Sequence, residues 1–154
     1  MSNEANIHAS CVSLRNQGVL LLGPSGAGKS DLALRLIDGG AKLVADDRTL
    51  LFVKNGALHA RAPSTISGLL EIRGIGIVRL PVRASVKIAL VVKLGEEGAR
   101  LPSRRFYRQP PALKLNTKLP QITLDARFPA TPAKIRAALA AFSDASFADT
   151  FILK

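Results

Sequence analysis

The chain has 154 residues, of which 47% are hydrophobic and 21% charged, and its formal net charge is +11. These values exclude a disordered chain and fit one domain over residues 1–154. No apolar run approaches the ~20 residues that span a bilayer, and the first residues lack the charged-then-apolar pattern of a secretion signal. Because the single Cys11 can form no internal disulfide, we expect a cytoplasmic protein without a membrane partner.

Two strands and a helix are predicted around a glycine-rich segment near the start. Residues 7–14 and 19–22 have strand composition, and residues 31–38 are strong helix formers that Gly39-Gly40 terminates. Between the second strand and the helix, residues 23–30 match the phosphate-loop pattern G-x-x-x-x-G-K-[ST] without a gap. The strand, loop and helix that this pattern requires are therefore all present.

The phosphate loop predicts a nucleotide site with Mg²⁺. Its glycines let successive backbone N–H groups face one concavity, and the helix that begins near Lys29 adds the positive end of its dipole. Lys29 should reach the outer phosphates, and the Ser30 hydroxyl should ligate the metal. The residues assigned to nucleotide binding are Gly23, Pro24, Ser25, Gly26, Ala27, Gly28, Lys29 and Ser30.

Two adjacent aspartates follow the next predicted strand. Residues 41–45 should form a strand parallel and adjacent to strand 19–22, because strand–helix–strand connections are right-handed crossovers. The C-terminal ends of both strands then open at one edge, which brings Asp46 and Asp47 beside the phosphate loop. Neighbouring residues point in different directions, so one carboxylate can face Mg²⁺ while the other acts as a base toward an acceptor hydroxyl. The sequence leaves open which aspartate has which role.

The remaining elements make the chain rich in strands. They are a hairpin of residues 49–54 and 57–61 around Asn55-Gly56, a glycine-broken element at 69–78, the longest strand at 85–94, a last core strand at 121–125, and a helix from Thr131 to Phe142. Residues 72–118 carry eleven basic side chains against two acidic ones. Residues 95–120 also contain several prolines, so we expect a long, mobile, basic loop there.

Two further side chains can serve the site. His8 lies in the predicted first strand, and if this strand flanks the phosphate-loop strand, its imidazole can orient an aspartate. Glu71 is the only acidic residue between Asp47 and Glu96. It can ligate Mg²⁺ or pair with Arg73, and the residues alone do not decide between these two roles.

Four motifs together resemble the catalytic domain of HPr kinase/phosphorylase, a bacterial protein-serine kinase. They are His8, the phosphate loop at 23–30, Leu-Val-Ala-Asp-Asp at 43–47, and Leu-Glu-Ile-Arg-Gly-Ile-Gly-Ile at 70–77, which is the family's signature stretch. The likeness runs from about Ile7 to the mid-130s. It implies an α/β fold of the P-loop, phosphoenolpyruvate-carboxykinase-like type, with a mixed, strand-rich sheet and few helices.

The resemblance also implies a reaction and the residues that carry it. ATP, with Mg²⁺, would phosphorylate a serine of HPr, a phosphocarrier of a bacterial phosphotransferase system, and family members also run the reverse attack by inorganic phosphate. The implied roles are Lys29 on the phosphates, Ser30, Glu71 and Asp46 on the metal, Asp47 as base, His8 against the aspartates, and Arg73 shaping the site. A basic loop near Arg104, Arg105 and Arg108 would supply one catalytic arginine, and the choice among them stays open.

The sequence departs from the longer family members at both ends. It starts at the catalytic domain and ends soon after the last predicted helix, without the usual N-terminal domain and C-terminal extension. Residues 125–132 stand where longer members carry a Pro-Gly-Arg-Asn stretch linked to dephosphorylation, with Arg127 as the matching piece. We therefore expect kinase activity and leave the reverse reaction open. Longer members are hexameric, which suggests a homo-oligomer here.

Two alternative functions share the phosphate loop. A small-molecule kinase would need an arginine-rich lid bounded by helices, whereas the chain is strand-rich after residue 49. A nucleotide-gated module that binds nucleic acid would need stacking surface, and residues 72–118 offer only Phe106 and Tyr107 as aromatics. We therefore expect no nucleic-acid partner and prefer the protein-serine kinase.

Overall fold

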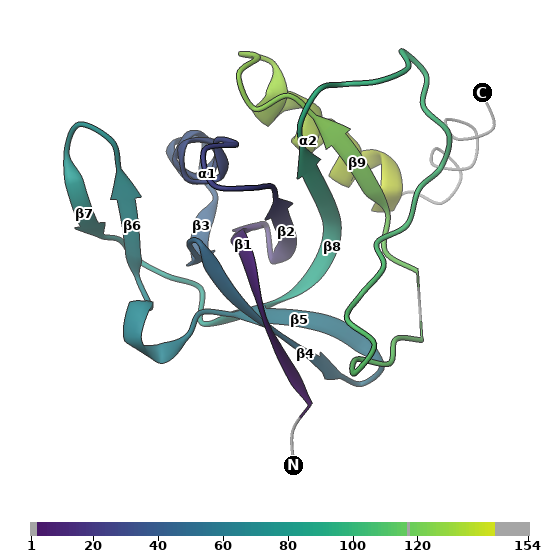
Figure 1. Cartoon of the computed structure of the whole chain (residues 1–154), viewed down its shortest axis with the longest axis horizontal. Coiled ribbons are helices and arrows are strands. Elements are labelled where there is room, and N and C mark those ends of the chain that lie inside the picture. Colours follow the sequence, from purple (N-terminus) through teal and green to yellow (C-terminus); the bar gives the residue numbers. More distant parts are fainter. Residues whose placement is uncertain (1–2, 117, 144–154) are drawn as a thin grey trace.

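The structure is a computed structural model that describes residues 3–116 and 118–143 (Figure 1). It confirms a mixed, strand-rich α/β fold, in which a seven-stranded sheet and a two-stranded sheet are accompanied by two α-helices. Residues 1–2, 117 and 144–154 of the predicted domain lie outside the described residues. The elements are β1 (Glu4–Leu14), β2 (Gln17–Leu22), α1 (Lys29–Asp38), β3 (Lys42–Ala45), β4 (Arg48–Lys54), β5 (Ala57–Arg61), a 3₁₀ turn (Ser64–Ile66), β6 (Leu69–Ile72), β7 (Gly76–Arg79), β8 (Ser85–Leu94), β9 (Gln121–Leu124) and α2 (Thr131–Ser143).

Two long strands, β1 and β8, hold the large sheet together by changing partners along their length. The first half of β1 pairs with β4, and its second half pairs with β2 and β3. β8 likewise pairs first with β5 and then with β2 and β9. The sheet therefore curls back on itself, from β2 through β1, β4, β5 and β8 to β2 again. The longest strand is β1, with 11 residues against 10 in β8, so the prediction that residues 85–94 form the longest strand is wrong.

The crossover from β2 through α1 to β3 is present, but the two strands are not neighbours as predicted. Both strands are antiparallel to β1, which lies between them. β2 and β3 therefore run parallel to each other. β1 can occupy this place because it reaches β2 through a tight hairpin, and α1 then packs across β1. The two strands still end at the same edge.

The predicted hairpin of β4 and β5 is confirmed with its turn. Asn55 and Gly56 have φ values of 54° and 75°, and two consecutive positive φ values are what a type I′ turn requires. The glycine-broken element is also a hairpin, made of β6 and β7, and it forms its own two-stranded sheet beside α1. Figure 1 shows it projecting from the body of the molecule.

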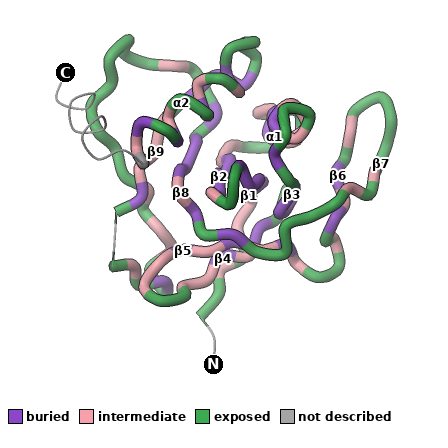
Figure 2. The backbone as a smooth tube through the Cα atoms, turned by 180° about the vertical axis from the view of Figure 1, so that it is seen from behind, coloured by how far each residue is buried: buried purple, intermediate pink, exposed green. Residues whose placement is uncertain are grey.

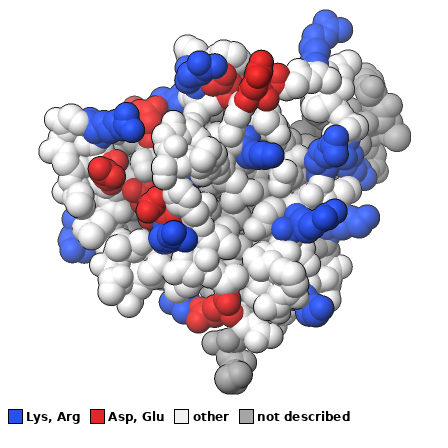
Figure 3. All heavy atoms as spheres, in the orientation of Figure 1, with Lys and Arg blue, Asp and Glu red and all other residues white. Residues whose placement is uncertain are grey.

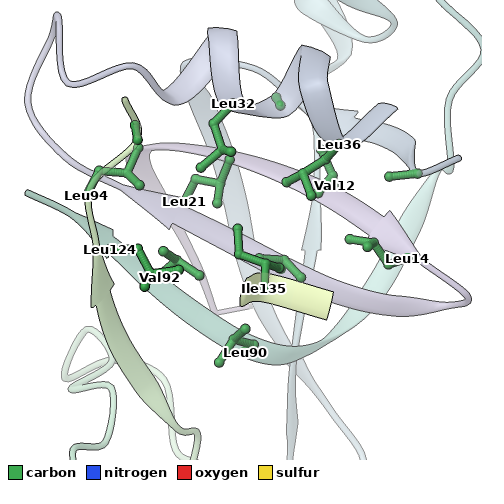
Figure 4. Close-up of a cluster of buried hydrophobic side chains, with 14 of the residues drawn as sticks. Val12, Leu14, Leu21, Leu32, Leu36, Leu90, Val92, Leu94, Leu124 and Ile135 are labelled. Carbon is green, nitrogen blue, oxygen red and sulfur yellow. The ribbon is translucent and has the colours of Figure 1, made fainter. Parts of the chain in front are cut away.

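The core has two parts, one on each side of the curled sheet. One part packs α1 and α2 against β1, β2, β8 and β9, and Figure 4 shows Leu32 of α1 beside Leu21 and Leu36 of α1 beside Val12. The other part lies among β1, β3, β4, β5 and β8 and includes Cys11. Burial raises the pKa of the Cys11 thiol, as expected for a core residue rather than a reactive one.

Residues 95–116 and 118–120 contain no helix or strand beyond one isolated bridge, Phe106 to Pro120. Two side chains in this segment, Leu113 and Leu119, are nevertheless buried against the second part of the core. Most of the other residues are exposed, as the tube in Figure 2 shows. In the part of the chain that the structure describes, no helix is long and apolar enough to cross a membrane.

Candidate active site

Four parallel strands end at one edge of the large sheet. β2 and β3 are both antiparallel to β1, while β8 is parallel to β2 and to β9. The segments that leave these four ends are the phosphate loop at 23–30, the two aspartates at 46–47, and residues 95–97 and 125–127. Open α/β sheets bind ligands at such an edge. The predicted meeting of aspartates and phosphate loop is confirmed, because the Ser30 hydroxyl donates to Asp46 Oδ1 over 2.6 Å.

The phosphate loop needs glycine immediately before α1. Gly28 has a φ of 97°, in the left-handed region, and a Cβ atom there would lie 3.0 Å from the Cβ of Ala126. Both the backbone conformation and the close approach of residue 126 therefore exclude a larger residue. The helix begins at Lys29, as the sequence predicts, so its first N–H groups face the loop.

Lys29 is buried at the base of the loop. Its ammonium donates to the carbonyl oxygens of Gly23, at 2.6 Å, and Pro24, at 3.1 Å. Burial lowers the pKa of Lys29, while the negative charges of Asp47 and Asp46 act in the opposite direction. Both aspartates therefore lie close enough to act electrostatically on Lys29, the residue that is expected to bind phosphate.

Asp46 is buried and accepts several hydrogen bonds. Its Oδ1 atom accepts from the hydroxyls of Ser30, at 2.6 Å, and Ser10, at 3.0 Å. Its Oδ2 atom lies 3.4 Å from the backbone nitrogen of Glu71. The carboxylate thus joins β1, the start of α1 and the β6–β7 hairpin.

Asp47 is the exposed member of the pair, with 66% of its side chain accessible. Its Oδ1 atom lies 2.8 Å from Nε2 of His8, so the predicted contact of His8 with an aspartate is confirmed. Asp47 has a φ of 67°, and the N–H of Arg48 donates back to the carbonyl oxygen of Asp46 over 2.7 Å. A bond between residues i and i+2 across a residue with positive φ is a γ-turn, which is rare and strained. This turn gives the two carboxylates different surroundings.

The two aspartates fill a break between β3 and β4. Cys11 pairs with Ala45 at the end of β3, and His8 pairs with Arg48 at the start of β4, so the two strands are in register along β1 at the point where they meet, while the rest of β3 is shifted by one residue beyond Cys11. The γ-turn therefore interrupts what would otherwise be one long strand along β1. The strand end predicted before Asp46 is confirmed, and the structure adds that the next strand, β4, begins directly after the turn.

Glu71 and Arg73 lie on the exposed β6–β7 hairpin. Glu71 reaches the aspartates through its backbone nitrogen, and within the described residues it forms no ion pair with Arg73. Among those residues, no hydrogen bond or ion pair joins the Arg73 side chain to the aspartates or to the phosphate loop. The β6–β7 hairpin therefore contacts Asp46 through the backbone of Glu71, and the side-chain roles predicted for Glu71 and Arg73 stay predictions.

The groups near Ser30 suit a magnesium ion shared with a nucleotide. No cluster of three or more His, Cys, Asp or Glu side chains that could hold a metal occurs within residues 3–116 and 118–143. The chain instead offers one hydroxyl, Ser30, and the carboxylate of Asp46 in contact with it. Mg²⁺ prefers few carboxylates together with phosphate oxygens and water, so this donor set fits the predicted metal.

A cavity of about 390 Å³ lies on the other side of the phosphate loop. Gly26, Ala27 and Leu94 line it together with Asp125 and Arg127. The Arg127 guanidinium donates to both carboxylate oxygens of Asp125, at 3.0 and 2.7 Å, and these bonds lower the pKa of Asp125 to about 2. Sequence reasoning singled out Arg127 but missed Asp125, whose position directly after the last core strand was the available signal.

Arg35 ties this corner to α1. Its guanidinium donates to the backbone carbonyl oxygens of Ala126 and Phe128, and it lies 3.2 Å from Asp31 one turn earlier in the helix. Ala126 is also the residue whose side chain lies close to Gly28 of the phosphate loop. One arginine thus fixes the loop after β9 against the start of the helix, a role that helix periodicity alone does not reveal.

A family model for the HPr Serine kinase C-terminal domain matches residues 1–141. The chain belongs to this family. It is 33% identical over 133 residues to an HPr kinase/phosphorylase of Lactobacillus acidophilus, 36% identical over 136 residues to one of Thermoanaerobacter pseudethanolicus, and 37% identical over 119 residues to one of Burkholderia lata. These matches cover 80%, 82% and 71% of this chain but 41%, 45% and 35% of the relatives. The chain therefore spans less than half the length of these curated relatives.

A solved structure supports the membership of the HPr serine kinase family. The Hpr(Ser) kinase/phosphatase from Coxiella burnetii matches with a TM-score of 0.72 and 27% sequence identity, over 88% of this chain and 94% of that chain. The P-loop fold that the sequence predicts is thereby confirmed.

Proposed function

We propose that this protein is an ATP- and Mg²⁺-dependent protein-serine kinase whose acceptor is an HPr-type phosphocarrier. The observation that carries the proposal is the contrast within one aspartate pair. Asp46 is buried and bonded to the phosphate-loop hydroxyl, whereas Asp47 is exposed and bonded to a histidine. A kinase needs one carboxylate on the metal and nucleotide side and another on the acceptor side.

The nucleotide side is assigned to the phosphate loop. Backbone N–H groups of residues 23–30 and the start of α1 would hold the phosphates, and Lys29 would move from the carbonyls of Gly23 and Pro24 to the outer phosphate oxygens. Ser30 and Asp46 would hold Mg²⁺, with Glu71 as a further ligand from the hairpin. The metal, when bound, neutralises charge on the phosphoryl group being transferred.

The acceptor side is assigned to Asp47 and His8. The serine hydroxyl of the acceptor would give its proton to an Asp47 carboxylate oxygen, and its oxygen would bond to the γ-phosphorus as the bond to the leaving ADP breaks. His8 would hold the carboxylate through the 2.8 Å contact. In the reverse direction, protonated Asp47 would return the proton to the serine as inorganic phosphate attacks.

The proposed partner is a protein for two reasons. The exposed Asp47 can meet a side chain on the surface of another molecule, whereas a small-molecule kinase would enclose its acceptor. The printed names of the relatives and of the solved structure specify HPr. We further propose that residues 1–154 act as a single catalytic domain in the cytoplasm, with Arg73 and one of Arg104, Arg105 and Arg108 on the acceptor side, and that copies of the chain associate.

The decisive experiment is phosphoryl transfer from labelled ATP to purified HPr with Mg²⁺. We expect phosphoserine on HPr, and no label on an HPr variant whose acceptor serine is replaced by alanine. A nucleotide-gated nucleic-acid module would instead turn over ATP only when nucleic acid is added. A small-molecule kinase would leave HPr unlabelled in both assays. Incubation of phosphoserine-HPr with inorganic phosphate then measures the reverse reaction through the release of pyrophosphate.

A further inference from the structure

Ser10 lies between the two aspartates and has no role in the phosphate-loop pattern. It belongs to β1, its accessible surface is 0%, and its neighbours Ala9 and Cys11 are also fully buried. A hydroxyl buried among apolar side chains costs free energy unless it is hydrogen-bonded. The hydrogen bonds of the Ser10 hydroxyl go to Asp46 and Asp47, so the site explains why a polar side chain stands here.

The directions of these bonds follow from chemistry alone. The backbone N–H of Asp47 can only donate, and it lies 3.1 Å from the Ser10 hydroxyl oxygen. That oxygen therefore accepts, and the single hydroxyl proton of Ser10 is left for Asp46 Oδ1, which lies at 3.0 Å. The same oxygen of Asp46 accepts from Ser30 at the start of α1. One continuous line of hydrogen bonds thus runs from the backbone of Asp47 to the phosphate loop.

This line reaches Asp47 at its strained point. Ser10 stands in the part of β1 that faces the break between β3 and β4, where no ladder bond holds the aspartates. Around Asp47, with its φ of 67°, the backbone makes the 2.7 Å γ-turn bond and the contact with Ser10, while His8 contacts only the side chain. A strained conformation persists only where its surroundings hold it.

We propose that Ser10 is a positioning residue that holds Asp47 in its γ-turn and couples the acceptor side to the metal-side carboxylate of Asp46. The inference rests on the proposed function, in which Asp47 is the base. Ser10 does not touch the nucleotide or the acceptor. It sets where the Asp47 carboxylate lies relative to the transferred phosphoryl group.

The expected effect of removing the hydroxyl falls on turnover rather than on nucleotide binding. In a Ser10→Ala variant the Asp47 N–H loses its acceptor, and the turn can relax toward an ordinary conformation. A misplacement of about 1 Å at a reacting group lowers rates on the order of 100-fold, so we expect kcat for HPr phosphorylation to fall roughly 10- to 100-fold. Because Lys29 and the loop N–H groups are unchanged, and Asp46 keeps its shorter bond from Ser30, KM for ATP should stay within about twofold.

Three variants and one control separate positioning from simple stability. Ser10→Ala removes the hydroxyl, Ser10→Cys fills the same space with a weak donor, and Ser10→Thr keeps the hydroxyl on a residue suited to strands. Ser13→Ala is the matched control, because Ser13 is a buried serine of the same strand without a bond to either aspartate. We expect Ser10→Ala and Ser10→Cys to lower kcat to a similar extent. Ser10→Thr should retain most of the wild-type kcat, and Ser13→Ala should leave kcat unchanged. Equal losses in Ser10→Ala and Ser13→Ala, or an unchanged kcat in Ser10→Ala, would overturn the proposal.

Hydrogen exchange of the Asp47 amide tests the same claim without any acceptor protein. In ¹⁵N-labelled protein, Ser10→Ala and Ser10→Cys should speed exchange of this amide at least about tenfold, because its acceptor is lost, while Ser13→Ala should not. An Asp47 amide with the same exchange rate in Ser10→Ala and wild type contradicts the positioning role. If the wild-type chain labels no HPr, the proposed function fails, and the exchange rates still decide whether Ser10 holds Asp47.

Discussion

The edge that carries the phosphate loop and the basic segment at 95–120 are built in opposite ways. At the edge, Lys29 and Asp46 are buried, and each makes at least two hydrogen bonds to groups on other elements or on the loop. The basic segment forms no helix or strand within its described residues, and its buried side chains are Leu113 and Leu119. Figure 3 shows Lys and Arg side chains over the side of the molecule where Figure 1 draws this segment.

The difference suits the two substrates of the proposed reaction. Binding of the phosphoryl donor, ATP, requires fixed hydrogen-bond donors and charges in a site that excludes water, because preorganised charge acts most strongly there. A protein acceptor arrives with its own surface, and exposed cationic side chains can meet it without being buried first. The two regions should therefore respond differently to substitution, and four predictions test this difference.

The largest effect is expected at Lys29. A Lys29→Met variant keeps the side-chain length but loses the charge that is proposed to bind the outer phosphates. Phosphorylation of HPr should fall at least about 100-fold, as when a fixed donor is removed from a transition-state site. The exposed Lys42 in β3 provides the control, and Lys42→Met should retain wild-type activity. Similar losses in both variants would show that the edge is not the donor site.

The next prediction concerns the stability of the fold and compares a buried with an exposed leucine of the basic segment. Leu113 is 1% exposed, so Leu113→Ala should lower the free energy of unfolding by about 2–4 kcal/mol through lost burial and a cavity. Leu101 in the same segment is 58% exposed, and Leu101→Ala should change the free energy of unfolding by less than about 0.5 kcal/mol. Chemical denaturation measures both. If the Leu113 variant unfolds like wild type, the segment is not anchored in the core.

A smaller effect is expected from the arginines of the basic segment. Replacing Arg104, Arg105 and Arg108 together by alanine should lower kcat/KM for HPr roughly tenfold at low salt, while KM for ATP changes little. The loss should shrink as salt is raised, because exposed charges are screened. Arg136→Ala in α2 is the control for the loss of an exposed arginine. A loss of kcat/KM that is the same at low and high salt would mean that these arginines take part in the phosphoryl transfer instead of attracting HPr.

The smallest effect is expected at the corner after β9. Arg127 holds the pKa of Asp125 at about 2, below its ordinary value of 3.8. A carboxyl with a lowered pKa stabilises the fold above its unfolded pKa, and this contribution is lost as the pH falls from about 4 toward 2. In Arg127→Met, NMR titration should show the pKa of Asp125 rising toward 3.8. An unchanged titration would mean that the backbone contacts, not the guanidinium, set the pKa.

The parts of the fold and site that could be predicted are those with local signals. The phosphate loop, the Asn55-Gly56 turn and the helix from Thr131 are encoded by short runs of residues with fixed geometry, and the structure has all three. The meeting of Ser30 with Asp46 was also predictable, because parallel strands end at one edge. These inferences need only the order of elements along the chain.

The parts that could not be predicted depend on partners distant in the sequence. The position of β1 between β2 and β3 is set by pairs of residues that lie 29 to 34 positions apart in the chain, which composition does not encode. The γ-turn at Asp47 lies where the end of β3 and the start of β4 meet on β1, and this arrangement places Ser10 beside the aspartates. Ser10 is flanked by the apolar Ala9 and Cys11 in the sequence, which is a weak signal that does not identify its hydrogen-bond partners.

The division of labour between the two aspartates is the central claim, and one paired measurement tests it. Asp46→Asn and Asp47→Asn are compared for HPr phosphorylation over a range of Mg²⁺ concentrations, with Asp38→Asn at the exposed end of α1 as the control. Asp46→Asn should raise the Mg²⁺ concentration needed for half-maximal activity. Asp47→Asn should lower kcat on the order of 100-fold or more at every Mg²⁺ concentration, as expected when a general base is lost. Near-normal transfer by Asp47→Asn, together with abolished transfer by Asp46→Asn at saturating Mg²⁺, would contradict the claim and reverse the assignment.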